Sequence, residues 1–317
     1  MWRDDTPVVR GDAKGERAVT AGFVRLPRSS ARPNVSTRAL LLAVAMSAAI
    51  GAQGVAQVAK PETVVVQSGG LRLHAVLWRP QGRGPFPAVL FNHGSGHATG
   101  ADVSGRRDQR YPDVLGPVFA RHGYVFLYLF RRGDGLSAGQ GIPAGDRMDA
   151  AATRGPQARN QIQIQLLEMD EMDDALAGLA FLRALPDVQA ERLAIAGTSF
   201  GGSLTLLVAE RDSTLRAAVA FATAGYSWER SPPLRDRLLA AVARTSVPVF
   251  FIHAANDYSI APGNALSAEM TRLGKPHQAK IYPAVGHSAD EGHAFVDLGV
   301  ATWEADVFGF LDAHLRP

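Results

Sequence analysis

Short apolar runs alternate with helical patterns along most of the chain after about residue 60. Residues 63–67 and 71–78 have the composition of two strands, and Ser68-Gly69-Gly70 between them predicts an antiparallel hairpin. Continuously apolar runs then follow, and we expect strands near 87–91, 124–130, 193–196, 217–221, 247–253 and 277–282. Uninterrupted apolar runs are typical of parallel strands that are buried on both faces.

Segments with helical spacing of apolar residues lie between these runs. We expect helices near residues 114–122, 161–185, 200–210 and 265–273, and a last one at the C-terminal end. The segment 161–185 carries leucine and methionine at helical spacing throughout, so it is predicted to be one long helix. A hairpin followed by repeated strand–helix units predicts an α/β fold, with a mostly parallel central sheet, an N-terminal antiparallel hairpin and helices on both faces.

The first 57 residues differ from the remainder of the chain. Arg38 precedes an apolar run at 39–50, and small residues follow, which predicts a signal peptide over about residues 36–56. Residues 58–317 are then the folded domain, and the protein is expected to be periplasmic or secreted. The alternative is a membrane anchor formed by an uncleaved segment 39–50. The polar stretch 1–35 is long for the start of a signal peptide, and a translation start near Val35 would explain it.

Composition and charge exclude several kinds of site. The chain has no cysteine, which excludes disulfides, thiolate metal sites and a cysteine nucleophile. The formal net charge is +3, but residues 1–57 carry eight basic and four acidic side chains, and the remainder carries 25 basic and 26 acidic ones. Basicity therefore belongs to the leader, and nothing in the charge pattern of the folded domain indicates a nucleic-acid partner.

One strand runs directly into a glycine-rich turn that carries a serine. The sequence Gly197-Thr198-Ser199-Phe200-Gly201 follows the apolar run 193–196, and a helical pattern begins at once. In a G-x-S-x-G turn the serine lies on a sharp strand-to-helix bend that exposes its hydroxyl, and the glycines leave room for the bend. The alternative is a tightly packed turn without chemistry. We favour Ser199 as a nucleophile.

A serine hydroxyl needs a base, and the base needs an acid to orient it, usually in the chain order Ser, Asp, His. Asp257 follows the predicted strand 247–253, in a loop expected at the carboxyl end of the sheet, and we take it as the acid rather than a helix cap. We take His287, next to Gly286 after the last strand, as the base. His293 is the alternative, expected to be a capping or surface residue. His253 is expected to be a buried histidine at a strand end.

An acyl-transfer site also needs two N–H groups for the negatively charged oxygen of the intermediate. The turn supplies the backbone N–H of Phe200. We expect the second from Ser95, or from Gly96 beside it, in the loop Asn92-His93-Gly94-Ser95-Gly96. His93 and His97 have a metal-like spacing without a third ligand cluster, so we expect no metal and no cofactor.

The motifs together resemble the α/β-hydrolase superfamily, in particular serine hydrolases of the dienelactone hydrolase and prolyl oligopeptidase catalytic-domain type. The matching segments include AVLFNHGSG, FRRGDGLSAG, LAIAGTSFGG, VPVFFIHAANDYSIAP and YPAVGHS, and in order they span most of residues 62–317. The resemblance implies Ser199, Asp257 and His287 as the triad. Dienelactone hydrolases proper use a cysteine nucleophile, which this chain lacks, and about 60 residues of leader cannot form the propeller of the oligopeptidases.

These features predict an exported serine hydrolase that acts on a carboxylic ester through an acyl-enzyme. The alternatives are a serine peptidase for short peptides and a binding protein with a vestigial triad. The partner is a small ester or a short peptide, with no stable membrane span after signal cleavage; the oligomeric state stays open. Arg131 and Arg132 could meet a substrate carboxylate, but ion pairs with the acidic helix residues 168–174 are the stronger expectation.

Overall fold

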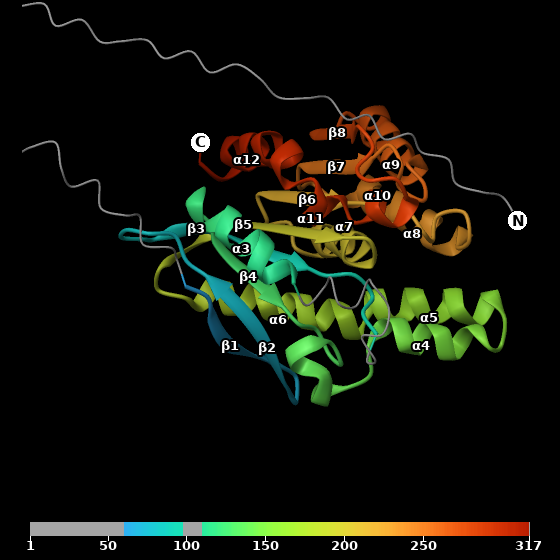
Figure 1. Cartoon of the computed structure of the whole chain (residues 1–317), viewed down its shortest axis with the longest axis horizontal. Helices are drawn as coiled ribbons and strands as arrows, with labels where there is room; N and C mark the ends of the chain where they lie inside the picture. The colour runs from blue at the N-terminus through green and yellow to red at the C-terminus, as the bar shows by residue number, and fades with distance from the viewer. Residues whose placement is uncertain (1–59, 98–109, 317) are drawn as a thin grey trace, which may run out of the picture. The chain divides into compact units, whose positions relative to one another are not determined.

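A mixed sheet of eight strands forms the centre of the computed structural model, which describes residues 60–97 and 110–316 (Figure 1). The strands, in the order β1-β2-β4-β3-β5-β6-β7-β8, have the bounds β1 Glu62–Ser68, β2 Leu71–Trp78, β4 Val125–Leu129, β3 Phe86–Asn92, β5 Val188–Thr198, β6 Ala217–Phe221, β7 Val249–Ala254 and β8 His277–Tyr282. The predicted leader 1–57, with its signal peptide and the possible start at Val35, lies outside the described residues.

The first two strands form the predicted hairpin. β1 pairs antiparallel with β2, Ser68 lies opposite Leu71, and Gly69 takes a φ of 55° in the turn, which glycine adopts without strain. β2 is antiparallel to β4, and every pairing from β4 onward through β3 to β8 is parallel. The predicted α/β-hydrolase fold is confirmed. Because the parallel strands point the same way, the loops after β3, β4, β5, β6 and β7 leave from one edge of the sheet.

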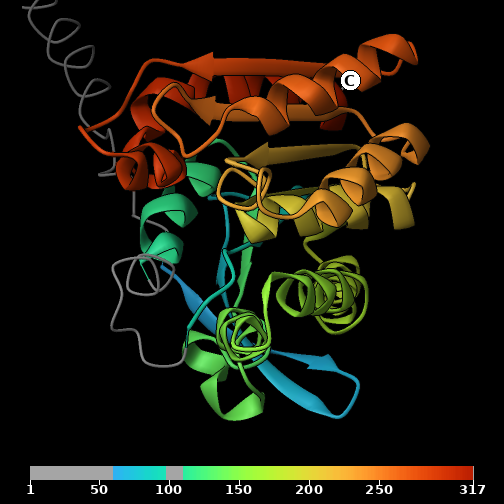
Figure 2. The ribbon, with the colours of Figure 1, turned by 90° about the vertical axis from the view of Figure 1, so that its right-hand side faces the viewer.

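Helices cover both faces of the sheet (Figures 1 and 2). One hydrophobic cluster packs the sheet against α4 Ala144–Ala152, α5 Pro156–Glu168, α6 Asp170–Ala184, α7 Phe200–Arg211, α8 Pro232–Arg244 and α9 Ala261–Arg272. A second cluster on the opposite face includes α3 Tyr111–Arg121, α11 Phe295–Leu298 and α12 Val300–Leu315. Between them, β3 to β7 are buried on both sides, which explains their continuously apolar sequences.

The prediction of one helix over 161–185 is wrong. The chain forms α5 and α6 with a break at Met169, whose backbone angles of φ −122° and ψ −92° are not helical. Three acidic side chains follow the break in the first turn of α6, where the positive end of a helix favours negative charge. Apolar periodicity continues across the break, so spacing alone could not reveal it. Glu171, just after the break, is fully buried.

Three further elements lie in segments for which the sequence predicted no helix. The segment after β4 contains the short 3₁₀ helix η2 Gly135–Gln140 and then α4, while α8 follows the loop after β6. No helix within residues 60–97 and 110–316 is both long enough and apolar enough to span a bilayer.

Candidate active site

Ser199 lies on a sharp turn between β5 and α7. Its φ of 57° and ψ of −117° are strained for a residue with a side chain, as expected of the serine in a G-x-S-x-G turn. A Cβ added to Gly197 would lie 2.4 Å from the carbonyl oxygen of Gly201, and one added to Gly201 would lie 2.2 Å from the carbonyl oxygens of Asn92 and His93. The glycines therefore allow backbone contacts that no other residue permits.

Three side chains from distant parts of the chain form a hydrogen-bonded line at the edge where the strands end. His293, the last residue of α10 Ala289–His293, has its Nε2 2.8 Å from the Oγ of Ser199. Its Nδ1 lies 2.6 Å from Oδ1 of Asp257 in the loop after β7. Because a carboxylate only accepts hydrogen bonds, Nδ1 carries the proton and donates it, and Nε2 accepts from the serine hydroxyl. This is the geometry of a Ser-His-Asp triad.

The expectation that His287 would occupy the histidine position is corrected by this geometry. His287 is exposed, and its backbone N–H donates to Oε2 of Glu291 at 2.8 Å. Ser288 and Glu291 form a capping box that begins α10, so His287 lies before the first turn of the helix. His293, six residues later, occupies the position beside Ser199 that was expected for His287.

Gly292 is the reason that His293 reaches Asp257. A Cβ on Gly292 would lie 2.4 Å from the carbonyl carbon of Asn256, so its absence lets α10 pack directly on the loop that carries Asp257. Both histidines follow a glycine, and the argument applied to Gly286-His287 holds equally for Gly292-His293. The capping-box pattern S-x-x-E at 288–291 is the sequence signal that could have separated them, since it begins a helix after His287.

Asn256 links this loop to the segment before α10, a role that the sequence did not reveal. Its Oδ1 accepts the backbone N–H of Val285 at 3.0 Å, and its Nδ2 donates to the carbonyls of Val285 at 2.8 Å and Ser288 at 2.7 Å. These three hydrogen bonds hold the start of α10 beside Asp257.

Three donors surround the carboxylate of Asp257. Oδ1 accepts from His293 and from the backbone N–H of Tyr258 at 2.7 Å, and Oδ2 accepts from Nδ1 of His253 at 2.8 Å. Burial alone would raise the pKa of Asp257, but the hydrogen bonds from the two histidines outweigh it and hold the pKa below its ordinary value. Asp257 is therefore ionised at neutral pH.

Arg131, just after β4, supports the loop in which Ser95 lies. Its Nη2 donates to the carbonyl oxygens of His93 at 3.0 Å and Gly94 at 2.7 Å, while its Nε donates to Glu171. Burial raises the pKa of the Glu171 carboxyl, and Arg131 counteracts this shift. The predicted ion pairs with the acidic helix are thus confirmed for Arg131, and also for Arg132, whose Nη2 lies 2.8 Å from Asp174.

The contact with Gly94 also orients the next peptide N–H. In a trans peptide the carbonyl of one residue and the N–H of the following residue point in opposite directions. Because Arg131 binds the Gly94 carbonyl, the N–H of Ser95 points away from Arg131. Phe200 is the first residue of α7, so its N–H has no acceptor within the helix. The assignment of these two N–H groups to an oxyanion hole stays a prediction.

His93 is a buried structural residue of the same loop. Its Nε2 accepts the backbone N–H of Arg131 at 3.2 Å, so Nδ1 is protonated and donates to the Gly94 carbonyl at 3.0 Å. Burial and the neighbouring Arg131 lower its pKa well below the usual range, which keeps the ring neutral. Within residues 60–97 and 110–316, no three His, Asp or Glu side chains are grouped closely enough to hold a metal ion.

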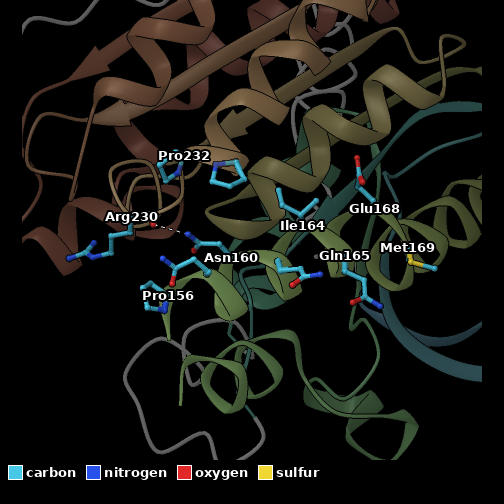
Figure 3. A pocket seen from close by; sticks show the side chains of 11 residues that line it. Pro156, Asn160, Ile164, Gln165, Glu168, Met169, Arg230 and Pro232 are labelled. Carbon is cyan, nitrogen blue, oxygen red and sulfur yellow. Dashed lines mark hydrogen bonds between the residues drawn. The ribbon is translucent and has the colours of Figure 1, made fainter. Parts of the chain in front are cut away.

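A cavity of about 900 Å³ lies between α5 and the start of α8 (Figure 3). Its walls are formed by Pro156, Gln157, Asn160, Gln161, Ile164, Gln165, Glu168, Met169, Arg230, Pro232 and Pro233. Arg230 covers the ring of Tyr226 at 4.1 Å, the Tyr226 ring lies 5.4 Å from that of Tyr258, and the Tyr258 ring lies 4.9 Å from that of His293. Two exposed tyrosine rings therefore link Arg230, in the wall of this cavity, to the histidine.

The fold and the Ser-His-Asp geometry define an α/β-hydrolase of the serine hydrolase type. Residues 110–296 match the model of the dienelactone hydrolase family, and this match covers more than half of the chain. The protein belongs to the dienelactone hydrolase family.

Individual relatives share only a low sequence identity with this chain. The quorum-quenching protein AidA of Acinetobacter baumannii is 28% identical over 161 residues, which is 50% of this chain and 43% of that protein. The match thus spans less than half of the relative's length. Among solved structures, an acylaminoacyl peptidase from Pyrococcus horikoshii has a TM-score of 0.58 at 16% identity, covering 90% of this chain and 45% of that one. A putative dienelactone hydrolase from Klebsiella pneumoniae has a TM-score of 0.52 at 21% identity, covering 82% and 99%. At such identities these structures show the fold alone.

Proposed function

We propose that this protein hydrolyses carboxylic esters through an acyl-enzyme, with Ser199 as the nucleophile, His293 as the base and Asp257 as the acid that orients it. The observation that carries the proposal is the pair of hydrogen bonds made by His293, at 2.8 Å to Ser199 and 2.6 Å to Asp257. Nucleophile, base and orienting group are in contact in the order that acyl transfer requires.

The chemistry follows from the positions of the protons. Oγ of Ser199 attacks the ester carbonyl carbon, and its proton passes to Nε2 of His293. The N–H groups of Phe200 and Ser95 hold the oxyanion, and Asp257 stabilises the imidazolium. When the intermediate collapses, Nε2 returns the proton to the departing alkoxide. A water molecule then attacks the acyl-enzyme, and the same proton transfers release the carboxylic acid and free Ser199.

The substrate of the proposed enzyme is either a carboxylic ester or a short peptide, and the two classes place different demands on the general acid. An alkoxide is a much weaker base than the amide anion that would leave from an unprotonated amide nitrogen, so an ester demands less of the general acid. Similarity to an acylaminoacyl peptidase structure keeps short peptides as the second candidate. Turnover of p-nitrophenyl esters should therefore be compared with that of aminoacyl nitroanilides, using wild type and Ser199→Ala. Hydrolysis of the nitroanilides alone would replace the ester proposal with the peptidase.

A fluorophosphonate probe tests whether the site reacts at all. We expect covalent labelling of wild type at Ser199 and none of Ser199→Ala, with peptide mapping to locate the adduct. A folded wild-type protein that stays unlabelled would indicate a binding protein with a vestigial triad.

We further propose that the protein is exported, on the basis of the apolar run at 39–50 and the small residues after it. Cell fractionation and N-terminal sequencing of the native protein test this. A mature N-terminus within about residues 53–57 supports cleavage, whereas an intact segment 39–50 in the membrane fraction indicates an anchor.

A further inference from the structure

His253 contacts the carboxylate of Asp257 on the side opposite to the triad histidine. It belongs to β7, its side chain is 1% exposed, and its Nδ1 lies 2.8 Å from Oδ2 of Asp257. His293 binds the other oxygen, Oδ1. The carboxylate therefore lies between two histidine rings, and only one of them reaches Ser199.

The tautomer of His253 follows from this contact. Asp257 can only accept, so Nδ1 of His253 carries the proton. Its Nε2 is buried and has no hydrogen-bond partner in the part of the chain that the structure describes. A buried polar atom without a partner is destabilising, and an apolar side chain of similar size would fill the same space without that cost. Packing alone thus does not account for a histidine at this position; the hydrogen bond to Asp257 does.

The neighbouring helix is fitted to the edge of this ring. A Cβ on Gly263, near the start of α9, would lie 2.8 Å from Cδ2 and 3.2 Å from Nε2 of His253. The ring is therefore held between β7 and α9 with little freedom to rotate.

We propose that His253 is a positioning residue that acts through Asp257: its Nδ1–H fixes the rotation of the carboxylate so that Oδ1 faces His293. This inference rests on the proposed function. Rotation of an aspartate carboxylate about Cβ–Cγ is soft, so the direction of its oxygens depends on their hydrogen bonds. Without the donor from His253, Oδ2 would be buried without a partner, and the carboxylate would turn toward another donor, moving Oδ1 away from Nδ1 of His293.

The test uses two substitutions that differ in one donor. In His253→Asn, the side-chain Nδ2 lies near the place of the histidine Nδ1 and can donate, whereas His253→Leu fills the space without a donor. We expect kcat for an ester substrate to fall by about 10- to 100-fold in His253→Leu, as for other small misplacements of catalytic groups, with KM little changed. His253→Asn should recover most of the rate. His277→Leu on β8, whose ring bonds the carbonyl of Lys275, is the matched control and should keep the wild-type rate.

The pH dependence of kcat distinguishes a positioning role of His253 from a purely structural one. The side chains of His253, Ser199 and Tyr258 contact Asp257 or His293. The hydroxyl of Tyr258 is itself hydrogen-bonded to the carboxylate of Asp290. If His253 donates to the carboxylate, its removal changes how strongly Asp257 attracts the imidazolium of His293. The acid limb of the pH–rate profile should then shift in His253→Leu and return in His253→Asn.

Four results would overturn the inference. If His253→Leu folds and keeps the wild-type kcat, His253 has no positioning role. The same conclusion follows if kcat falls equally in the Leu and Asn variants. A further loss from His253→Leu in an Asp257→Ala background would show that His253 does not act through Asp257. His253→Phe, which keeps the ring without nitrogens, replaces the Leu variant if the latter fails to fold. The rate of fluorophosphonate labelling separates this inference from the proposed function: an unlabelled wild type contradicts the function, whereas equal labelling rates in wild type and His253→Leu contradict the inference.

Discussion

The Nε2 of His293 lies 2.8 Å from the Oγ of Ser199, although the two residues are 94 positions apart in the chain. The serine is at the end of a central strand, and the histidine ends a five-residue helix after the last strand. Their contact depends on how α10 packs on the loop after β7, and it supports the proposal that His293 is the base.

The first prediction separates His293 from His287. We expect His293→Ala to lower kcat by about 10³-fold or more, close to the level of Ser199→Ala, because triad members act as a unit. His287→Ala should stay within about two-fold of wild type, as surface substitutions usually do. Steady-state kinetics on one ester, with melting temperatures for all variants, provides the measurement. A dead His287→Ala beside an active His293→Ala would contradict the observed geometry.

A second prediction concerns pH. The pKa of Asp257 is lowered in the folded protein, so its contribution to stability is fully present above about pH 4, the ordinary pKa of an unfolded aspartate, and is lost as the pH falls through the lower folded value. Activity should fall at a higher pH than this, because a histidine base must be neutral to accept the serine proton. Rates and melting temperatures measured from about pH 2 to pH 9 would show the two losses separately. A rate that is flat from pH 5 to 9 would count against a histidine base.

Arg131 and Glu171 allow stability and activity to be tested apart. Arg131→Met leaves the fully buried Glu171 without its partner, which should destabilise the protein by about 3–5 kcal/mol. The double variant Arg131→Met/Glu171→Leu should recover most of that stability. It should still have a lower kcat, because the His93 carbonyl loses its bond from Arg131, the Gly94 carbonyl keeps only the donor from His93, and the Ser95 N–H is held less firmly. Denaturant unfolding and ester kinetics on the same samples decide this. Wild-type kcat in the double variant would mean that Arg131 supports the fold only.

The last prediction uses a pair of glycine substitutions. The new Cβ in Gly292→Ala would lie 2.4 Å from the backbone of Asn256, so α10 must shift and His293 must move from Asp257. We expect kcat to fall by about 10- to 100-fold. Gly309→Ala, within α12, is the control, since nothing lies within 4 Å of its added Cβ. It should keep the wild-type rate and raise the free energy of unfolding by up to about 1 kcal/mol. Equal rates in the two variants would refute the proposed fit of α10.

Features that depend on local patterns could be predicted from the sequence alone. Apolar runs and glycine-rich turns predicted the strands, the hairpin and the α/β fold, because burial on two faces leaves a continuous apolar signature. The turn around Ser199 was recognisable because its backbone contacts demand glycine at 197 and 201. The position of Asp257 followed from the strand before it, and the acidic residues at 170–174 indicated the ion pairs of Arg131 and Arg132.

Which glycine–histidine pair meets Asp257 depends on contacts between segments distant in the chain. His287 and His293 have similar local surroundings in the sequence, and the difference between them arises from contacts of Gly292 and Asn256 that join segments about 30 residues apart. The break at Met169 was likewise hidden, because the apolar spacing continues across it. The second histidine on Asp257 was also hidden, since a buried strand-end histidine has the same sequence pattern with or without a carboxylate beside it. Local patterns report which face of an element is buried, whereas the partner of each buried polar group depends on the packing of the whole domain.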